Sequence, residues 1–171
     1  MRHVKWIFVV LLASSLTSFI EKGKSTGGLN VGDVAPDFKI EPTSKQTKSA
    51  KFALSDLKGK YVLLSFWASY DTQSRMQNIQ LSNVLKSANP SHVELVSISF
   101  DEYPSIFKET IKMDEIETPN CFIEHKGEES TLYKRYKLNR GFKNYLLDEN
   151  GVILAKNISA IELPNYLRAA S

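Results

Sequence analysis

The sequence predicts an α/β domain in which helices cover both faces of a mixed sheet. Two continuous apolar runs, KYVLLSFW at residues 60–67 and VELVSISF at residues 93–100, have the composition of strands buried on both faces. A helical pattern lies between them, so we expect parallel strands joined by a right-handed crossover. A later pair of apolar segments flanks the turn signal ENG at residues 149–151, which predicts an antiparallel hairpin. These observations define a three-layer architecture.

The first 19 residues have the three-part layout of an export signal. Arg2 and Lys5 precede the apolar run Trp6–Ala13, and small polar residues follow that run. The alternative is an uncleaved anchor, but residues 6–20 include Ser and Thr and are fewer than the roughly 20 apolar residues that span a bilayer. We therefore expect cleavage near residue 19, export to the periplasm or cell envelope of a bacterium, and no stable membrane insertion afterwards.

A polar, glycine-rich linker at residues 20–30 separates this signal from a single domain predicted at residues 31–171. The domain begins with two short alternating segments, DFKIEP and KFALSDL, on either side of the polar tract TSKQTKSA. This arrangement predicts an N-terminal β-hairpin with a mobile tip.

The helices follow from periodicity and from helix-end signals. Apolar residues at helical spacing define the first helix: Leu81, Val84, Leu85 and Ala88. It should end before Asn89-Pro90, because proline disfavours helical conformation in the residue before it. Pro104 marks the start of a second helix. A shorter helix is expected within EESTLYKRY, residues 128–136, and a last helix is expected over residues 162–169.

The composition is typical of a globular chain. Of 171 residues, 42% are apolar and 24% are charged. Removing Arg2 and Lys5 with the predicted signal lowers the formal net charge from +3 to +1. We find no basic run interleaved with aromatic residues, so we expect no nucleic-acid partner. We also expect neither a metal site nor a cofactor.

Three motifs resemble a known family. VGDVAPDF at residues 31–38, LSDLKGKYVLLSFWAS at residues 54–69 and YLLDENGVI at residues 145–153 are similar to motifs of the thioredoxin superfamily. The resemblance is to its exported ResA/TlpA-type thiol-disulfide reductases and to the related AhpC/TSA-like redoxins, and it covers about residues 31–168. It implies a thioredoxin-like fold with a mixed central sheet.

The chain departs from that family where the family does its chemistry. The resemblance implies W-C-x-x-C-R after F-W-A-S, but this sequence has Tyr70-Asp71-Thr72-Gln73-Ser74-Arg75. Asp71 therefore stands in the position of the nucleophilic cysteine, and Ser74 in that of the resolving cysteine. Phe142 occupies the position of the family's cis-proline. Ser65 stands where thioredoxin has a buried acid. Three further residues are expected at the rim of this degenerate site: Trp67, Tyr70 and Arg75. The alternative for Trp67 is packing in the core, and for Tyr70 it is a partly exposed surface ring with no role.

The replacements remove the redox couple. Dithiol exchange needs a thiolate that attacks a disulfide and a second thiol that resolves the mixed intermediate. Asp71 keeps a negative charge at the expected helix start, where we predict that it acts as an N-cap with or without a binding role. A Ser/Asp hydrolytic pair is the least favoured interpretation, because no His lies nearby in sequence. For Phe142 we expect a trans peptide bond, since cis costs a non-proline residue about 2.5–4 kcal/mol.

Cys121 is the single cysteine of the chain, so no internal disulfide can form. One interpretation is structural, a small apolar residue in or beside a short strand. The other is a reactive thiol, which would need exposure and a positive neighbourhood. Its close neighbours in sequence are Glu117, Glu124 and His125.

Two functions remain open on this basis. The favoured hypothesis is an exported, non-catalytic binding or accessory module, with no catalytic residue expected. Its partner would be another envelope protein that contacts the face around Tyr70, Asp71 and Phe142. The alternative is a thiol-disulfide oxidoreductase or peroxidase-like antioxidant protein that acts through Cys121.

Overall fold

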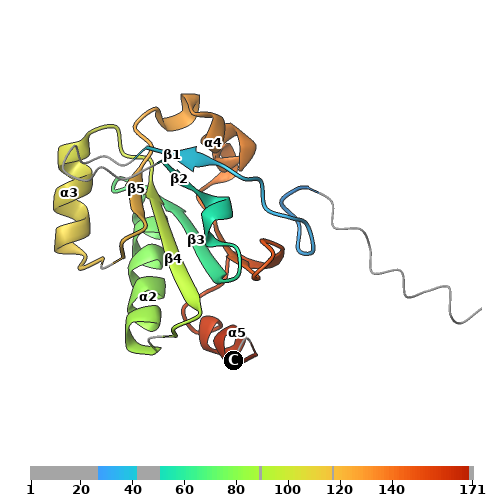
Figure 1. Cartoon of the computed structure of the whole chain (residues 1–171). Coiled ribbons are helices and arrows are strands. Elements are labelled where there is room, and N and C mark those ends of the chain that lie inside the picture. The colour runs from blue at the N-terminus through green and yellow to red at the C-terminus, as the bar shows by residue number, and fades with distance from the viewer. Residues whose placement is uncertain (1–26, 42–50, 89, 117, 170–171) are drawn as a thin grey trace, which may run out of the picture.

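The computed structural model describes residues 27–41, 51–88, 90–116 and 118–169 (Figure 1). The predicted signal, residues 1–19, and the predicted hairpin tip, residues 43–50, lie outside this part of the chain. The description begins before the predicted domain start at residue 31. Gly27 forms an isolated bridge with Val34, and Leu29 packs against the core.

A five-stranded sheet forms the centre of the molecule, in the order β5-β4-β3-β6-β7. The strands are β3 (Tyr61–Trp67), β4 (Val93–Ser99), β5 (Cys121–Ile123), β6 (Asn144–Leu147) and β7 (Ile153–Lys156). Strands β3, β4 and β5 are parallel, whereas β6 and β7 each run antiparallel to the preceding neighbour in the sheet. Core clusters cover both faces of β3, which explains why its sequence is a continuous apolar run.

The predicted N-terminal hairpin is confirmed as a separate two-stranded sheet. Strands β1 (Lys39–Ile40) and β2 (Phe52–Ala53) pair antiparallel, and the 3-10 helix η2 (Leu54–Leu57) follows directly. Phe38 and Ile40 from this region are buried in the same core cluster as Val62 of β3. The hairpin therefore covers one face of the main sheet.

Helices cover both faces of the main sheet, as predicted (Figure 1). Three of them contribute to the core clusters on one face: α2 (Thr72–Ala88), α3 (Pro104–Met113) and α5 (Leu163–Ala169). The opposite face holds α4 (Thr131–Arg135) with the 3-10 helices η3 (Gly127–Glu129) and η4 (Leu138–Arg140). The helix expected over residues 128–136 is thus shorter, because the Ser130 hydroxyl accepts a hydrogen bond from the Tyr133 N–H at 3.0 Å and begins α4 there.

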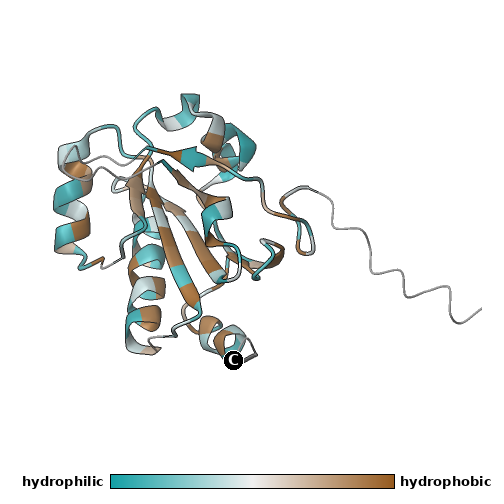
Figure 2. Ribbon diagram, viewed as in Figure 1, coloured by the Kyte–Doolittle hydropathy of each residue, from teal (hydrophilic) through white to brown (hydrophobic). Residues whose placement is uncertain are grey.

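The alternation of β3 side chains divides the core. Val62, Leu64 and Phe66 face the hairpin and α4, whereas Leu63 and Trp67 face the layer of α2 and α3. Apolar residues accordingly concentrate on the strands, while the helices carry both hydrophobic and hydrophilic residues (Figure 2). No helix in the described part of the chain has the length and hydropathy of a membrane span. The three-layer thioredoxin-like fold class is confirmed.

Candidate functional site

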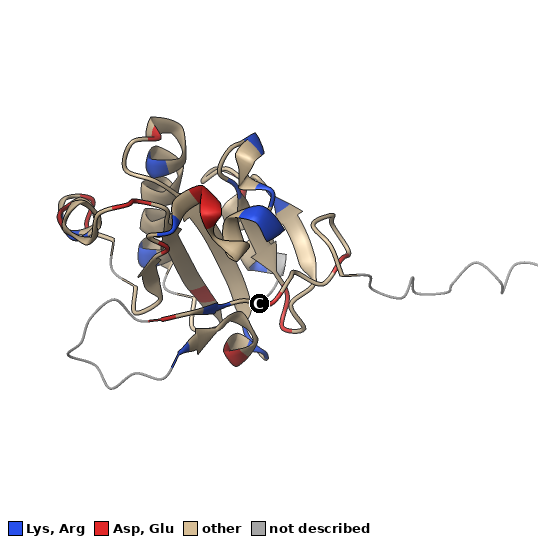
Figure 3. Ribbon diagram, turned by 90° about the horizontal axis from the view of Figure 1, so that it is seen from above, with Lys and Arg blue, Asp and Glu red and all other residues tan. Residues whose placement is uncertain are grey.

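The degenerate dithiol positions lie where β3 ends and α2 begins. This is the carboxyl end of the parallel strands, where open α/β sheets commonly bind ligands. Figure 3 views the molecule from above, with its Lys, Arg, Asp and Glu residues coloured. The residues that form this end come from β3, α2, the segment after β4 and the segment before β6.

Asp71 caps α2, as the sequence predicts. Its Oδ1 accepts a hydrogen bond from the Ser74 backbone N–H at 2.8 Å, and its carbonyl oxygen accepts one from the Arg75 N–H at 3.0 Å. The Ser74 side chain is buried, and its hydroxyl donates to the Asp71 carbonyl oxygen at 3.2 Å. Both side chains that replace the sulfurs are therefore engaged in closing the first turn of the helix.

Asp101, which sequence reasoning missed, is a buried carboxylate beside this turn. Only 2% of the residue is exposed. Its Oδ1 accepts hydrogen bonds from the Ser69 N–H at 2.9 Å and the Ser69 hydroxyl at 2.6 Å, and its Oδ2 accepts one from the Ser99 hydroxyl at 2.7 Å. These bonds hold the corner that leads from β3 to Tyr70. The available signal is an acid directly after a buried parallel strand.

Arg75 is fixed by an ion pair rather than left free at the rim. Its Nε and Nη2 donate to the two carboxylate oxygens of Asp114, at 2.8 and 2.6 Å. The Asp114 side chain is 6% exposed and that of Arg75 is 28% exposed. This bidentate pair joins the first turn of α2 to the residue that follows α3. Asp114 was not predicted, because nothing in the sequence links it to Arg75.

Trp67 does not lie at the rim, which corrects the prediction. It is fully buried, since β3 alternation directs it toward α2 and α3. Its ring packs near Phe107, with centroids 6.4 Å apart. Its Nε1 donates a hydrogen bond to the Ser97 hydroxyl at 2.8 Å, which in turn donates to Asn78 Oδ1 at 3.1 Å. A partner protein could not contact this ring without unfolding the site.

Phe142 and Tyr70 form an aromatic patch over the former site. No peptide bond in the described part of the chain is cis, so Phe142 has the expected trans bond. Its ring stacks on Phe100 at 5.7 Å and contacts Tyr133 edge-on at 6.4 Å. Tyr70, which is 71% exposed, lies with its ring centroid 6.5 Å from that of Phe142. We call Tyr70, Phe142 and Tyr133 the aromatic patch.

The electrostatic surroundings of Tyr70 are acidic. Partial burial raises the pKa of its hydroxyl, and the carboxylates of Asp101, Glu128 and Asp71 raise it further. Glu128 Oε1 also accepts a hydrogen bond from the Tyr133 hydroxyl at 3.3 Å. The aromatic patch is thus neutral itself, and carboxylates border it near Tyr70 and Tyr133.

Cys121 is the first residue of β5 and lies away from the aromatic patch. It pairs with Ser97 in the parallel register and packs in the cluster of Trp67 and Phe107. Burial raises the pKa of the Cys121 thiol to about 11, although a hydrogen bond with Ser97 acts in the opposite direction. The prediction of a residue in a short strand is confirmed.

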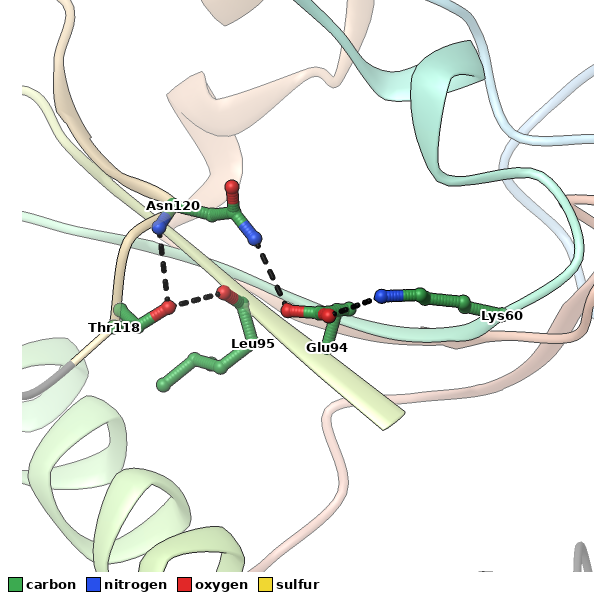
Figure 4. Close-up of polar contacts among 5 residues, drawn as sticks. All are labelled: Lys60, Glu94, Leu95, Thr118 and Asn120. Atoms are coloured by element: carbon green, nitrogen blue, oxygen red, sulfur yellow. Dashed lines mark hydrogen bonds and ion pairs between the residues drawn. The ribbon is translucent and has the colours of Figure 1, made fainter. Parts of the chain in front are cut away.

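A polar network fixes the start of β5 (Figure 4). Lys60 Nζ donates to Glu94 at 2.6 Å, and Asn120 Nδ2 donates to the other Glu94 oxygen at 3.2 Å. Thr118 Oγ1 donates to the Leu95 carbonyl oxygen at 2.8 Å and accepts from the Asn120 N–H at 3.2 Å. The neighbouring Cys121 is consequently held in the strand rather than in a mobile loop.

Comparison with known families decides the relationship. The model of the AhpC/TSA family matches residues 31–156. The chain belongs to the AhpC/TSA family. The chain also belongs to the ResA/TlpA-type branch of the thioredoxin superfamily, as the resemblance implies.

Several relatives of this AhpC/TSA member are known by sequence or structure. It is 28% identical over 131 residues to the thiol-disulfide oxidoreductase ResA of Oceanobacillus iheyensis, covering 75% of this chain and 67% of the relative. It is 27% identical to the thioredoxin-like protein YneN of Bacillus subtilis, over 87% of this chain and 86% of that relative. The crystal structure of a thioredoxin-like protein from Parabacteroides distasonis has a TM-score of 0.70 and 42% identity, over 85% of this chain and 99% of that chain.

The described part of this AhpC/TSA member contains no group of three or more His, Cys, Asp or Glu side chains placed to hold a metal ion. Its candidate site consists of an aromatic patch, a helix N-terminus closed by its own cap, and a buried carboxylate that positions the corner between them.

Proposed function

We propose that this AhpC/TSA member is an exported binding or accessory module that has lost disulfide exchange. One observation carries the proposal. At the start of α2, where the family places its dithiol, Asp71 and Ser74 bond to the helix backbone and to each other. A side chain that caps a helix needs no sulfur, whereas electron transfer between disulfides needs two.

The chemistry of the replacements supports loss of activity. A carboxylate does not attack a disulfide sulfur to form a mixed disulfide, and a serine hydroxyl needs a neighbouring base to become a nucleophile. The Ser74 hydroxyl donates a hydrogen bond to a carbonyl oxygen and the residue is 5% exposed, so it has neither a base nor access to a substrate. The Asp71 and Ser74 pair therefore supplies no nucleophile for either a reductase or a hydrolase reaction.

The retained scaffold supports binding. At the carboxyl end of the sheet, the exposed Tyr70 ring lies beside the half-buried Phe142 ring, and Asp101 holds the corner before Tyr70. Exposed aromatic rings on a rigid frame are typical of protein interfaces. We propose that an envelope protein contacts Tyr70, Asp71 and Phe142, with the basic and apolar signal of residues 1–19 directing the chain to the envelope.

The alternative enzyme, acting through Cys121, has less support. A thiol with a pKa near 11 is almost wholly protonated at neutral pH, and the thiolate is the reactive form. Cys121 is also joined to Ser97 and the Trp67 cluster rather than to the aromatic patch.

An insulin-reduction assay with dithiothreitol as electron donor tests the proposal. The wild-type chain should precipitate insulin no faster than the Cys121→Ala variant, which contains no cysteine. Turnover that exceeds this control would mean that Cys121 works as an exchange thiol and would overturn the loss of activity. Export is tested separately, by locating the tagged full chain in cell fractions; recovery in the cytoplasm alone would contradict it.

A further inference from the structure

The segment from α4 to β6 carries a concentrated positive charge beside the aromatic patch. Residues 130–147 contain five basic side chains and no acidic one. They are Lys134, Arg135, Lys137, Arg140 and Lys143. Removing these five from the 22 basic residues of the chain leaves fewer basic than the 19 acidic side chains. The net positive charge of the protein is therefore located in this segment.

Most of these cations have no partner within the described part of the chain. Arg135 donates a hydrogen bond to the Asp37 carbonyl oxygen, which ties α4 to the N-terminal region. The other four make no side-chain hydrogen bond or ion pair with a described residue. Lys134, Lys137 and Arg140 are exposed, and Lys143 is half-buried. By contrast, Lys51, Lys60 and Arg75 each pair with a carboxylate.

Two of the five cations lie next to Phe142 in the chain. Arg140 and Lys143 flank Phe142 in the chain, and the Gly141 N–H bonds to the Leu138 carbonyl oxygen in a tight turn. Gly141 adopts φ +97°, a backbone conformation that brings the chain round between η4 and β6. Lys143 is held by its carbonyl oxygen, which accepts from the Phe66 N–H at 3.0 Å. The charges around Phe142 thus stand on a fixed backbone.

We propose that the aromatic patch and the cations Arg140 and Lys143 bind an acidic peptide segment of the partner, an inference that rests on the proposed function. An apolar or aromatic side chain of the segment packs against Tyr70 and Phe142. Its carboxylates reach Arg140 and Lys143, where arginine can accept a carboxylate in bidentate geometry.

The carboxylates near Tyr70 and Tyr133 favour a peptide over a continuous polyanion. Glu128 and Asp71 border Tyr70 and would repel a nucleic acid or an anionic membrane surface laid across the whole patch. A short peptide can present its acidic residues to Arg140 and Lys143 and keep them away from Glu128.

Fluorescence anisotropy with two labelled synthetic peptides of equal length tests the inference. The first has a central Leu-Tyr flanked by Asp and Glu, and the second has Lys at every acidic position. The full chain should bind the first peptide, more weakly as salt is raised, and should not bind the second. Substituting Arg140→Glu with Lys143→Glu should weaken binding roughly tenfold, since two attractive pairs become repulsive. Arg140→Gln with Lys143→Gln gives a milder loss if the first variant does not fold.

The matched control changes one Lys and one Arg far from the patch. Lys58→Glu with Arg168→Glu makes the same charge change directly after η2 and in α5, and binding should stay within about twofold, because distant exposed charges are screened. Equal binding of both peptides, equal loss in the control, or no binding below ~1 mM would overturn the inference. So would tighter binding of a single-stranded oligonucleotide or of phosphatidylglycerol vesicles. None of these outcomes concerns disulfide exchange, so the insulin assay judges the proposed function separately.

Discussion

Removing the Asp71 cap should measurably destabilise the chain. In Asp71→Ala the Ser74 N–H loses the acceptor that now lies at 2.8 Å, and α2 loses the negative charge at its N-terminus. Loss of an N-cap costs about 0.5–2 kcal/mol, and loss of the favourable interaction with the helix macrodipole costs a further 0.3–1 kcal/mol, roughly. We expect a total of about 1.5 kcal/mol. In a chain of 171 residues this lowers the melting temperature by roughly 3–6 °C.

Urea unfolding monitored by circular dichroism measures this loss, with two controls. Asp71→Asn keeps an acceptor oxygen and should lose only the charge contribution, about 0.5 kcal/mol. Gln73→Ala changes an exposed residue of the same turn and should alter the free energy of unfolding by less than about 0.5 kcal/mol. If Asp71→Ala is as stable as the wild type, Asp71 is not held in place as a cap and its retention needs another explanation.

Two further predictions concern the ion pair and the thiol. Arg75→Ala should lower the free energy of urea unfolding by about 3 kcal/mol, because the buried Asp114 carboxylate loses its bidentate partner. Asp114→Asn should lower it by less. If both variants are as stable as the wild type, the ion pair does not stabilise the chain. Cys121 should react with Ellman's reagent roughly 100-fold more slowly in the folded chain than in urea. Burial raises the pKa of its thiol from 9.0 to about 11, which lowers the fraction of the reactive thiolate. Because the folded pKa is the higher one, this thiol contributes its full stability below pH 9 and loses it as pH rises from 9 to 11. The stability difference between wild type and Cys121→Ala should therefore shrink over that window by up to about 1.4 kcal/mol per pH unit, and a difference independent of pH would contradict the burial.

The sheet and its helices could be predicted because their signals are local. Strand β3 is apolar at nearly every position because both of its faces are buried, and Pro104 begins α3 as expected. The turn between β6 and β7 was recognised from Asn150-Gly151. Its Asp148 carboxylate accepts from the backbone N–H groups of Asn150 and Val152, which the sequence alone did not indicate.

The residues that were missed depend on tertiary structure. Trp67 was expected at the rim, yet strand alternation turns it inward; the direction of a side chain at a strand end cannot be read without the partner layers. Asp101 and Asp114 bond to residues more than 30 positions away in sequence. The expectation that no basic run interleaves with aromatic residues is wrong for residues 134–143, where five basic residues and two aromatic rings occur in ten positions. Only the structure shows that its apolar members face inward while its cations stay outside.

Restoring both sulfurs tests the central claim most directly: the scaffold is intact and only the exchange chemistry is absent. The measurement is the rate of insulin reduction by the double variant Asp71→Cys with Ser74→Cys, beside the wild-type chain and with folding checked by circular dichroism. We predict turnover in the double variant, slowed by Phe142 over the site, and none in the wild type. A wild-type rate equal to that of the double variant, or a folded double variant with no activity at all, would contradict that claim.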